Sequence, residues 1–361
     1  MRKLASIKKI SSISPIEGRD RIVLATVDGW SVIVKKDEFR VGDLCVYVEI
    51  DSVMPEKPEF EFLRKTGFRI KTMRMAGVVS QGICFPLSIL PYRADGYALN
   101  EDVTSILGIK QYEGTMDVEP SDEKKQNKRK YPSFLMRMPW FRKLVSSKKL
   151  SEEFPSFIRK TDEVRIQNIP DILQDKNTVW VATEKIDGQS GTFCLVRHKS
   201  RLPFVRDKFE YIVCSRNKRI PVKDNSTYWY VSEKYHIEEC LRELIGDLDW
   251  IAIQGECIGP KVQGNKYKVS KPDLYVFNLI TPSGRIDSML ARSVCQEMDL
   301  KFVPILENVY VLPDTVDDVL KYAHGQSRIG DTLREGIVFR SSDGQKSFKA
   351  VDPLFLMKYD E

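Results

Sequence analysis

Two apolar runs flank the tetrapeptide KIDG at residues 185–188, and no other feature constrains the local fold of this chain as tightly. The first run enters from Val179, and the second extends over residues 192–196. Short apolar runs on either side of a glycine-containing turn predict a strand, a tight connection and a second strand. We therefore expect Lys185 at the end of one strand, facing the connection to the next.

A lysine in this position can act as a nucleophile only if its pKa falls well below its ordinary value of about 10.4. Desolvation or a nearby metal cation lowers the pKa of a lysine, and the carboxylate of Asp187 would help to bring such a metal. A K-x-D-G pattern alone is weak evidence, because most copies are surface turns. The clusters that follow it along the chain carry the functional argument.

The composition is typical of a soluble globular protein with two domains. The chain has 361 residues, of which 42% are hydrophobic and 30% are charged, and this length allows two sizeable cores. No apolar run approaches the ~20 residues that a membrane-spanning helix needs, and the N-terminus lacks the apolar core of a secretory signal. We expect no membrane partner. The net charge of +6 permits a polyanionic partner without proving one.

The cysteines and histidines argue against a structural metal site. The cysteines are scattered singly, without a C-x-x-C pair, at Cys45, Cys84, Cys194, Cys214, Cys240, Cys257 and Cys295. A zinc ribbon or a disulfide framework is therefore not expected, and buried thiols in a reducing compartment are. The histidines His198, His236 and His324 share no ligand spacing. These features predict an intracellular, cytoplasmic protein.

Residues 1–110 are predicted to form an OB-like β-barrel. Residues 22–27 and 30–34 flank Asp28-Gly29, a strong hairpin signal. Further strands are expected at 44–50, 69–75 and 82–85, the last preceded by the segment 78–81. Short strands separated by turns favour a small barrel. The pattern leaves open whether this domain binds nucleic acid or is structural.

Residues 111–150 are predicted to be a connector that is acidic at first and then basic. The acidic residues are Glu113, Asp117, Glu119, Asp122 and Glu123, and Phe134, Trp140 and Phe141 lie among the basic residues that follow. Basic residues interleaved with aromatic rings suit nucleic acid, whereas a solvated linker is the alternative that Pro132 and Pro139 favour. The segment KKQNKRK leaves a nuclear location open.

Residues 151–361 alternate between strand and helix patterns. Strands are expected at 179–182, 192–196, 211–214, 250–255, 274–280, 336–340 and 347–351, and helices at 227–245, 287–298 and 316–323, the last capped by Asp314 or Thr315. This pattern predicts an α+β domain built on antiparallel sheet. The chain has neither a P-loop motif nor a dinucleotide-binding glycine motif after a strand.

Charged residues end or interrupt several of these strands downstream of the lysine. They are Arg216 in SRN, Glu256 in QGE, Glu335 in REGIVFR and Lys349 in KSFKAV, and Phe277 lies within the strand LYVFNLI. Each residue alone is more often structural. Together they indicate one cavity, because desolvated charges need partners. Carboxylates, lysines, an arginine and an aromatic ring in one cavity suit a metal-bound nucleotide.

The order and content of these motifs resemble the covalent nucleotidyltransferase superfamily of ligases and capping enzymes. Within it, KIDG, SRN, QGE, YVFN, REGIVFR and SFKAV are most similar to the nick-sealing RNA ligases, as is the segment KTDEVRIQN at 160–168. Only twelve residues follow Lys349, so we expect no domain after this motif. A β domain in front of residues 151–361 resembles the Deinococcus-type branch, in which an OB-like module precedes the nucleotidyltransferase (adenylation) domain.

The resemblance implies an ATP-dependent RNA ligase that works through a lysyl-AMP intermediate. Lys185 would attack the α-phosphorus of ATP, and AMP would then pass to an RNA 5′-phosphate that a 3′-hydroxyl attacks. Asp187, Glu256 and Glu335 would hold Mg²⁺ or Mn²⁺, directly or through its waters. The implied catalytic set is Lys185, Asp187, Glu256, Glu335 and Lys349.

The resemblance also implies a set of residues that bind the nucleotide. Arg216 would lie near the ribose or the phosphates, Phe277 on the adenine and Lys349 at the α-phosphate. The full expected set is Glu184, Lys185, Arg165, Arg216, Phe277, Lys349 and Lys346. Many relatives carry a second lysine two residues after the first, where this chain has Val351, and Lys346 is the proposed substitute.

The expected partner is RNA or a nicked duplex that contains RNA, and the protein is expected to be a monomer. Two alternatives stay open. One is a DNA ligase or a broad polynucleotide ligase, because the sequence does not show which sugar is recognised. The other is a non-catalytic nucleic-acid-binding protein with a decayed ligase fold.

Overall fold

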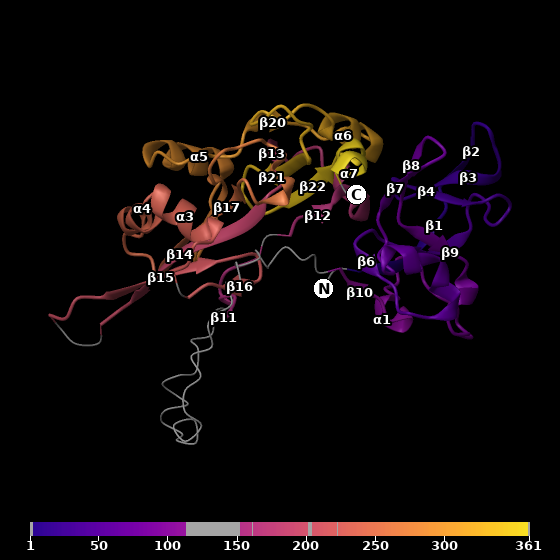
Figure 1. Cartoon of the computed structure of the whole chain (residues 1–361), viewed down its shortest axis with the longest axis horizontal. Coiled ribbons are helices and arrows are strands. Elements are labelled where there is room, and N and C mark those ends of the chain that lie inside the picture. Colours follow the sequence, from indigo (N-terminus) through magenta and orange to yellow (C-terminus); the bar gives the residue numbers. More distant parts are fainter. Residues whose placement is uncertain (1–2, 113–151, 161, 201–203, 222, 360–361) are drawn as a thin grey trace, which may run out of the picture.

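A computed structural model describes residues 3–112, 152–160, 162–200, 204–221 and 223–359 (Figure 1). The acidic, basic and aromatic residues of the expected connector lie outside the described residues. The remaining chain forms an N-terminal domain of short strands and a larger C-terminal domain, which lie side by side in Figure 1. Within the described ranges, no helix combines the length and the apolar character needed to cross a bilayer.

The N-terminal domain is built from small antiparallel sheets around one apolar core. Its strands are β1 Ala5–Lys9, β2 Ser12–Ile16, β3 Arg19–Val27, β4 Trp30–Lys35, β5 Leu44–Val48, β6 Ser52–Val53, β7 Thr72–Met75, β8 Val78–Gln81, β9 Ile83–Phe85 and β10 Lys110–Gln111. The short helical segments are η1 Pro58–Thr66, η2 Leu87–Ile89 and α1 Thr104–Leu107. The sheets have the orders β1-β5-β9, β2-β3-β4, β7-β8 and β10-β6.

The hairpin predicted at Asp28-Gly29 is confirmed. Val27 of β3 pairs with Trp30 of β4, and Asp28 and Gly29 both have positive φ angles, of 48° and 79°. Two successive left-handed residues form the turn type whose twist matches a two-residue hairpin. The strands β1, β2, β6, β8 and β10 were not predicted, because they are short and lack a clear alternation of apolar residues.

The prediction that the cysteines are buried thiols is confirmed. All seven cysteines are buried and free. Cys45 and Cys84 lie in the core of the N-terminal domain, where their sulfur atoms are 3.8 Å apart. This separation is well beyond the S–S bond length of about 2.0 Å.

The C-terminal domain consists of two sheets with helices packed on them. The larger sheet has the order β11-β16-β15-β14-β17-β18-β19, and the smaller one has the order β12-β22-β21-β13-β20. The strands are β11 Glu152–Glu153, β12 Val164–Arg165, β13 Trp180–Lys185, β14 Gln189–His198, β15 Lys208–Cys214, β16 Lys218–Arg219, β17 Trp250–Ile258, β18 Asp273–Thr281, β19 Gly284–Arg285, β20 Ile305–Tyr310, β21 Gly336–Ser341 and β22 Ser347–Val351. All pairs are antiparallel except β12 with β22.

The helices cover one face of each sheet. They are α3 Thr227–Lys234, α4 Ile237–Leu244, α5 Ser288–Glu297, α6 Val316–Ala323 and α7 Pro353–Tyr359. Helices α3, α4 and α5 share an apolar core with the larger sheet, and α6 shares one with the smaller sheet. The sequence prediction of α6 is confirmed, and its N-cap is Thr315, whose side chain accepts a hydrogen bond from the Asp318 amide.

The single helix predicted over 227–245 is wrong. Two helices, α3 and α4, occupy this segment, and His236 between them has a φ angle of 48°. A left-handed residue cannot continue a right-handed helix. The apolar spacing continues across the break because both helices cover the same core, so periodicity alone did not reveal it.

The KIDG turn joins the two sheets of the C-terminal domain. Strand β13 of the smaller sheet ends at Lys185, and β14 of the larger sheet begins at Gln189. The predicted strand, turn and strand are therefore confirmed. The turn places Lys185 where the two sheets meet.

The N-terminal domain docks on the C-terminal domain through a few specific contacts. Trp30 donates an indole hydrogen bond to the Asn168 side chain over 3.3 Å. Leu356 of α7 packs against the N-terminal core. Asp51 lies 4.0 Å from the Arg165 guanidinium, which places a residue of the N-terminal domain next to the expected nucleotide site.

Candidate active site

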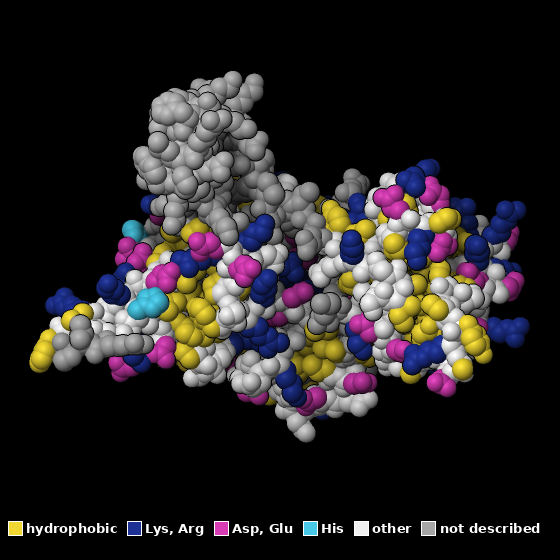
Figure 2. All heavy atoms as spheres, turned by 90° about the horizontal axis from the view of Figure 1, so that it is seen from below, with side chains coloured by type: hydrophobic (Ala, Val, Ile, Leu, Met, Phe, Trp, Pro, Cys, Tyr) yellow, Lys and Arg dark blue, Asp and Glu magenta, His cyan; other side chains and the backbone are white. Residues whose placement is uncertain are grey.

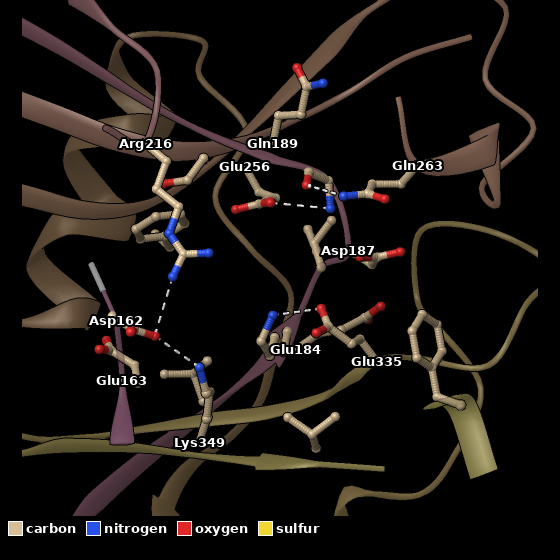
Figure 3. Close-up of a pocket in the computed structure, with 18 of the residues that line it drawn as sticks. Asp162, Glu163, Glu184, Asp187, Gln189, Arg216, Glu256, Gln263, Glu335 and Lys349 are labelled. Carbon is tan, nitrogen blue, oxygen red and sulfur yellow. Dashed lines mark hydrogen bonds and ion pairs between the residues drawn. The ribbon is translucent and has the colours of Figure 1, made fainter. Parts of the chain in front are cut away.

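One cavity of about 570 Å³ is lined by residues of both domains (Figure 3). From the expected site residues it includes Arg165, Glu184, Lys185, Asp187, Arg216, Glu256, Phe277, Glu335 and Lys349. The N-terminal domain contributes Asp51 and Arg69, and the residues that directly follow it contribute Gln111 and Tyr112. The structure thus brings together side chains that are far apart in the sequence, such as Asp51 and Lys349.

Lys185 lies among three carboxylates. Its amine donates a hydrogen bond to Glu335 Oε2 over 2.6 Å. Burial acts to lower the pKa of Lys185, but Glu335, Glu256 and Asp187 outweigh it and raise the pKa above its ordinary value. The residues around Lys185 therefore do not lower its pKa, and they keep the amine charged at neutral pH. The lowering that a nucleophile needs would require a further positive charge, such as a bound metal ion.

The other two carboxylates are held by the chain around the KIDG turn. Glu256 accepts a hydrogen bond from the Gly188 amide over 3.1 Å, and burial raises the pKa of Glu256 to about 8. Asp187 forms an ion pair with Lys266. Burial, together with repulsion from Glu335, raises the pKa of Asp187 to about 6.

These carboxylates fit a divalent cation that keeps some of its waters. Among the described residues, no group of three or more His, Cys, Asp or Glu side chains closes around a common point. Burial nevertheless leaves the pKa values of Asp187 and Glu256 raised, even though the Lys266 and Lys185 amines lie nearby, so these oxygen donors would gain from a further cation. Hard cations such as Mg²⁺ are bound by one or two carboxylates and retain several waters.

Lys349 and Arg216 converge on Asp162 on the other side of the cavity (Figure 3). The Lys349 amine is 3.1 Å from Asp162 Oδ1, and the Arg216 guanidinium is 3.5 Å from the same oxygen. Burial lowers the pKa of Lys349 to about 8. Lys349 pairs in register with Arg165 of β12, so three basic residues line this wall.

Phe277 provides an aromatic face in the cavity wall. It lies in β18, and the Arg340 guanidinium is 5.7 Å from the centre of its ring. Arg340 is buried and donates a hydrogen bond to the Thr183 hydroxyl over 3.2 Å. Burial lowers the pKa of Arg340 to about 10.

The chain belongs to a recognisable group of proteins. A family model described as RNA ligase matches residues 178–358, and one described as an OB-fold domain matches residues 4–87. The chain belongs to the RNA ligase family. Its N-terminal domain is an OB-fold domain, and the predicted α+β fold class is confirmed.

Solved structures of a Naegleria gruberi RNA ligase are similar to this RNA ligase over almost the whole chain. A variant without ligand is 31% identical, with a TM-score of 0.80 and coverage of 99% of this chain and 98% of that one. A variant with ATP and Mn has the same identity and TM-score and 99% coverage of both chains. A structure with pyrophosphate covers 100% of this chain and 99% of that one, at 31% identity and a TM-score of 0.80. Among curated proteins, no match was found.

Two expected residues of this RNA ligase are differently placed. The Lys346 amine contacts Asp175 over 2.6 Å, and Lys346 does not line the cavity. Glu184 lines the cavity, but its carboxylate accepts hydrogen bonds from the Ser327 hydroxyl and the Arg328 amide over 2.5 and 2.8 Å. Burial raises the pKa of Glu184. Lys346 therefore does not contact the site, and Glu184 binds the segment that contains Ser327 and Arg328.

Sequence reasoning missed several residues at the site of this RNA ligase. Asp162 lies in the segment KTDEVRIQN, which was recognised only as a whole. Lys266 and Tyr267 lie in a loop, and the Tyr267 hydroxyl accepts a hydrogen bond from the Asp187 amide over 2.8 Å. A loop gives no periodic signal, so nothing in the pattern marked them. Asp51 and Arg69 enter the cavity only because the domains dock.

Gly188 is the residue of KIDG that packing requires to be glycine. A Cβ atom there would lie 2.4 Å from the Cys257 carbonyl oxygen and 3.0 Å from Glu256 Cγ. We expect Gly188→Ala to lower the free energy of unfolding by about 1–3 kcal/mol, as overpacking does, and to displace Glu256. Urea unfolding measures the first effect, and lysyl-AMP formation the second.

The matched control is Gly259→Ala. A Cβ atom at Gly259 meets nothing nearer than 3.5 Å, so the free energy of unfolding should stay within about 0.5 kcal/mol of wild type. Equal stability of the Gly188 and Gly259 variants would contradict the packing argument.

Proposed function

We propose that this RNA ligase joins RNA 3′-hydroxyl and 5′-phosphate ends at nicks in duplexes, with ATP as the nucleotide. It would act through AMP bound to Lys185 and then through an adenylated 5′ end. The observation that carries the proposal is the Lys185 amine at a strand end, among three carboxylates, in a cavity that Phe277, Arg216 and Lys349 also line. The Naegleria gruberi ligase structures with ATP and Mn and with AMP and Mn support these ligands.

The first step forms a phosphoramidate. The Lys185 ammonium group first loses a proton, and Glu335 Oε2, at 2.6 Å, is placed to accept it. The nitrogen then attacks the α-phosphorus of ATP, the bond to pyrophosphate breaks, and the nitrogen gives up a second proton to solvent. A Mg²⁺ or Mn²⁺ ion held by Asp187, Glu256 and Glu335, directly or through waters, would offset the negative charge that keeps Lys185 protonated and the charge that develops on the phosphate.

The remaining residues bind and orient the nucleotide. Lys349 would contact the α-phosphate and stabilise its charge in the transition state. Arg216 would contact the ribose or phosphates, and Phe277 would stack on the adenine. Arg165, beside Lys349 in the sheet, extends the basic wall toward the phosphates.

The second and third steps need RNA. The RNA 5′-phosphate attacks the phosphorus of the lysyl-AMP and frees the Lys185 amine, and the 3′-hydroxyl then attacks the adenylated end and releases AMP. We assign residues 1–110 to the OB-like domain, 111–150 to a basic connector and 151–361 to the nucleotidyltransferase domain. We further propose a cytoplasmic monomer of the Deinococcus-type branch, which the free buried cysteines and the domain order support.

Nicked duplexes with RNA or DNA on each side of the break test the substrate. Sealing is expected with an RNA 3′-hydroxyl strand, and incubation with α-labelled ATP and a divalent cation should label the protein. Efficient sealing of all-DNA nicks would instead show a broad polynucleotide ligase. No label in wild-type protein would show a binding protein with a decayed ligase fold.

Binding of a nicked duplex should weaken steeply as salt rises. On the face in Figure 2, acidic and basic side chains of the described residues are interspersed, so the basic stretch of the connector, 124–130, is expected to supply phosphate contacts. About six such contacts would cost on the order of a thousandfold in affinity between about 50 and 200 mM salt. Fluorescence anisotropy measures this, and an affinity independent of salt would contradict a clamp built on phosphate contacts.

A further inference from the structure

Lys266 is the ion-pair partner of one of the carboxylates that are expected to bind the metal. It lies in the loop between β17 and β18, and its amine forms an ion pair with Asp187. Both side chains are mostly buried, with 15% and 16% of their surface exposed. Resemblance and strand pattern gave no role to this lysine.

The surrounding structure holds the Lys266 amine in place. It lies 5.1 Å from the centres of the Phe355 and Tyr359 rings of α7, within the range of a cation–π contact. The loop that carries it is tight, since Asn265 and Lys268 have φ angles of 50° and 52°. Both the loop and α7 therefore hold the Lys266 amine beside Asp187.

The charges around Lys185 pair off in a simple way. Lys185 pairs with Glu335, Lys266 pairs with Asp187, and Glu256 accepts the Gly188 amide instead of a cation. These three carboxylates thus face two ammonium groups. A divalent cation that binds Asp187 has to compete with an amine that is already bonded to it.

We propose that Lys266 is an internal cation that occupies Asp187 in the nucleotide-free protein, and that a divalent cation must displace it to reach this carboxylate. The proposal rests on the metal role assigned to Asp187 in the proposed function. It makes Lys266 the residue that sets how much divalent cation the ligase requires. Removing the Lys266 charge leaves the carboxylates more negative, so the cation binds more tightly.

A structural ion pair makes the opposite prediction. If Lys266 served only to orient Asp187, its loss would disorder the carboxylate and weaken metal binding, as the loss of partners that orient metal ligands does. The sign of the change in affinity therefore separates the two roles.

Mn²⁺ binding to the full-length, nucleotide-free protein tests the proposal. Wild type, Lys266→Met and Lys266→Gln are titrated with Mn²⁺, and the free ion is followed by electron paramagnetic resonance. Methionine keeps an apolar stem between the rings, and glutamine keeps a polar end. Lys268→Met is the matched control, because Lys268 is exposed in the same loop. We expect both Lys266 variants to bind Mn²⁺ about tenfold more tightly, and Lys268→Met to match wild type.

An affinity equal to or weaker than that of wild type in folded Lys266 variants, including no measurable binding by any of the proteins, overturns the proposal. Circular dichroism establishes that the variants are folded. Labelling of wild type with α-labelled ATP distinguishes a failure of the proposed function from a failure of the role proposed for Lys266. If wild type forms the adduct and the Lys266 variants do not gain affinity, only the role of Lys266 is wrong; if wild type forms no adduct, the proposed function fails.

Discussion

We expect the Lys185→Met variant to form no lysyl-AMP adduct and to seal nicks from ATP more slowly than wild type by a factor on the order of 10⁵ or more, because the nucleophile is removed. Methionine keeps the length and most of the volume of the side chain but has no amine to attack phosphorus. Mass spectrometry of protein incubated with ATP and Mg²⁺ detects the adduct on the peptide that contains residue 185, and a gel assay measures sealing.

A substrate that already carries AMP distinguishes loss of the nucleophile from loss of the site. RNA with an adenylated 5′ end needs no lysyl-AMP, so Lys185→Met should seal it within about tenfold of the wild-type rate, since only the first nucleophile is missing. Lys346→Met is the matched control, because this lysine lies outside the cavity. Labelling of Lys185→Met at the wild-type level would refute the assignment, and loss of sealing with both substrates would show a damaged site.

Wild-type protein freed of divalent cations is expected to take up no AMP, a loss of at least about a thousandfold relative to the Mg²⁺-loaded protein. The structural reason is the raised pKa of Lys185, which lies above the ordinary value of 10.5 because of Glu335, Glu256 and Asp187. A lysine with a raised pKa stays charged below that pKa, so an increase to about pH 9 should not restore labelling.

The measurement is adduct formation after chelation, followed by return of Mg²⁺ or Mn²⁺ to the same sample. Recovery of labelling shows that the protein survived chelation. Labelling at the full rate without a divalent cation would mean that the carboxylates around Lys185 serve another purpose.

The sequence predicted the parts of the site that lie at strand ends. Lys185, Glu256 and Glu335 interrupt or end apolar strands, where a charge needs a reason to be buried, and the structure places all three in one cavity. Their partners could not be read in the same way. Asp162 and Lys266 lie outside strands. Whether a loop residue reaches a cavity depends on the path of the backbone, and the spacing of apolar residues does not reveal that path.

The same limit applies to the fold. Strands with a buried face, such as β17 and β18, were found from their apolar runs, whereas β1 and β2 were missed. The break between α3 and α4 depends on one left-handed residue, His236. Asp51 lines the cavity only because the two domains dock, and no local sequence pattern can show how domains dock.

Helix α7 contacts both domains at once. Its Leu356 packs against the core of the OB-fold domain, while its Phe355 and Tyr359 line the cavity beside Lys266. A displacement of the OB-fold domain would therefore either move this helix, and with it the cavity wall beside Lys266, or break the contact of Leu356 with the OB-fold core.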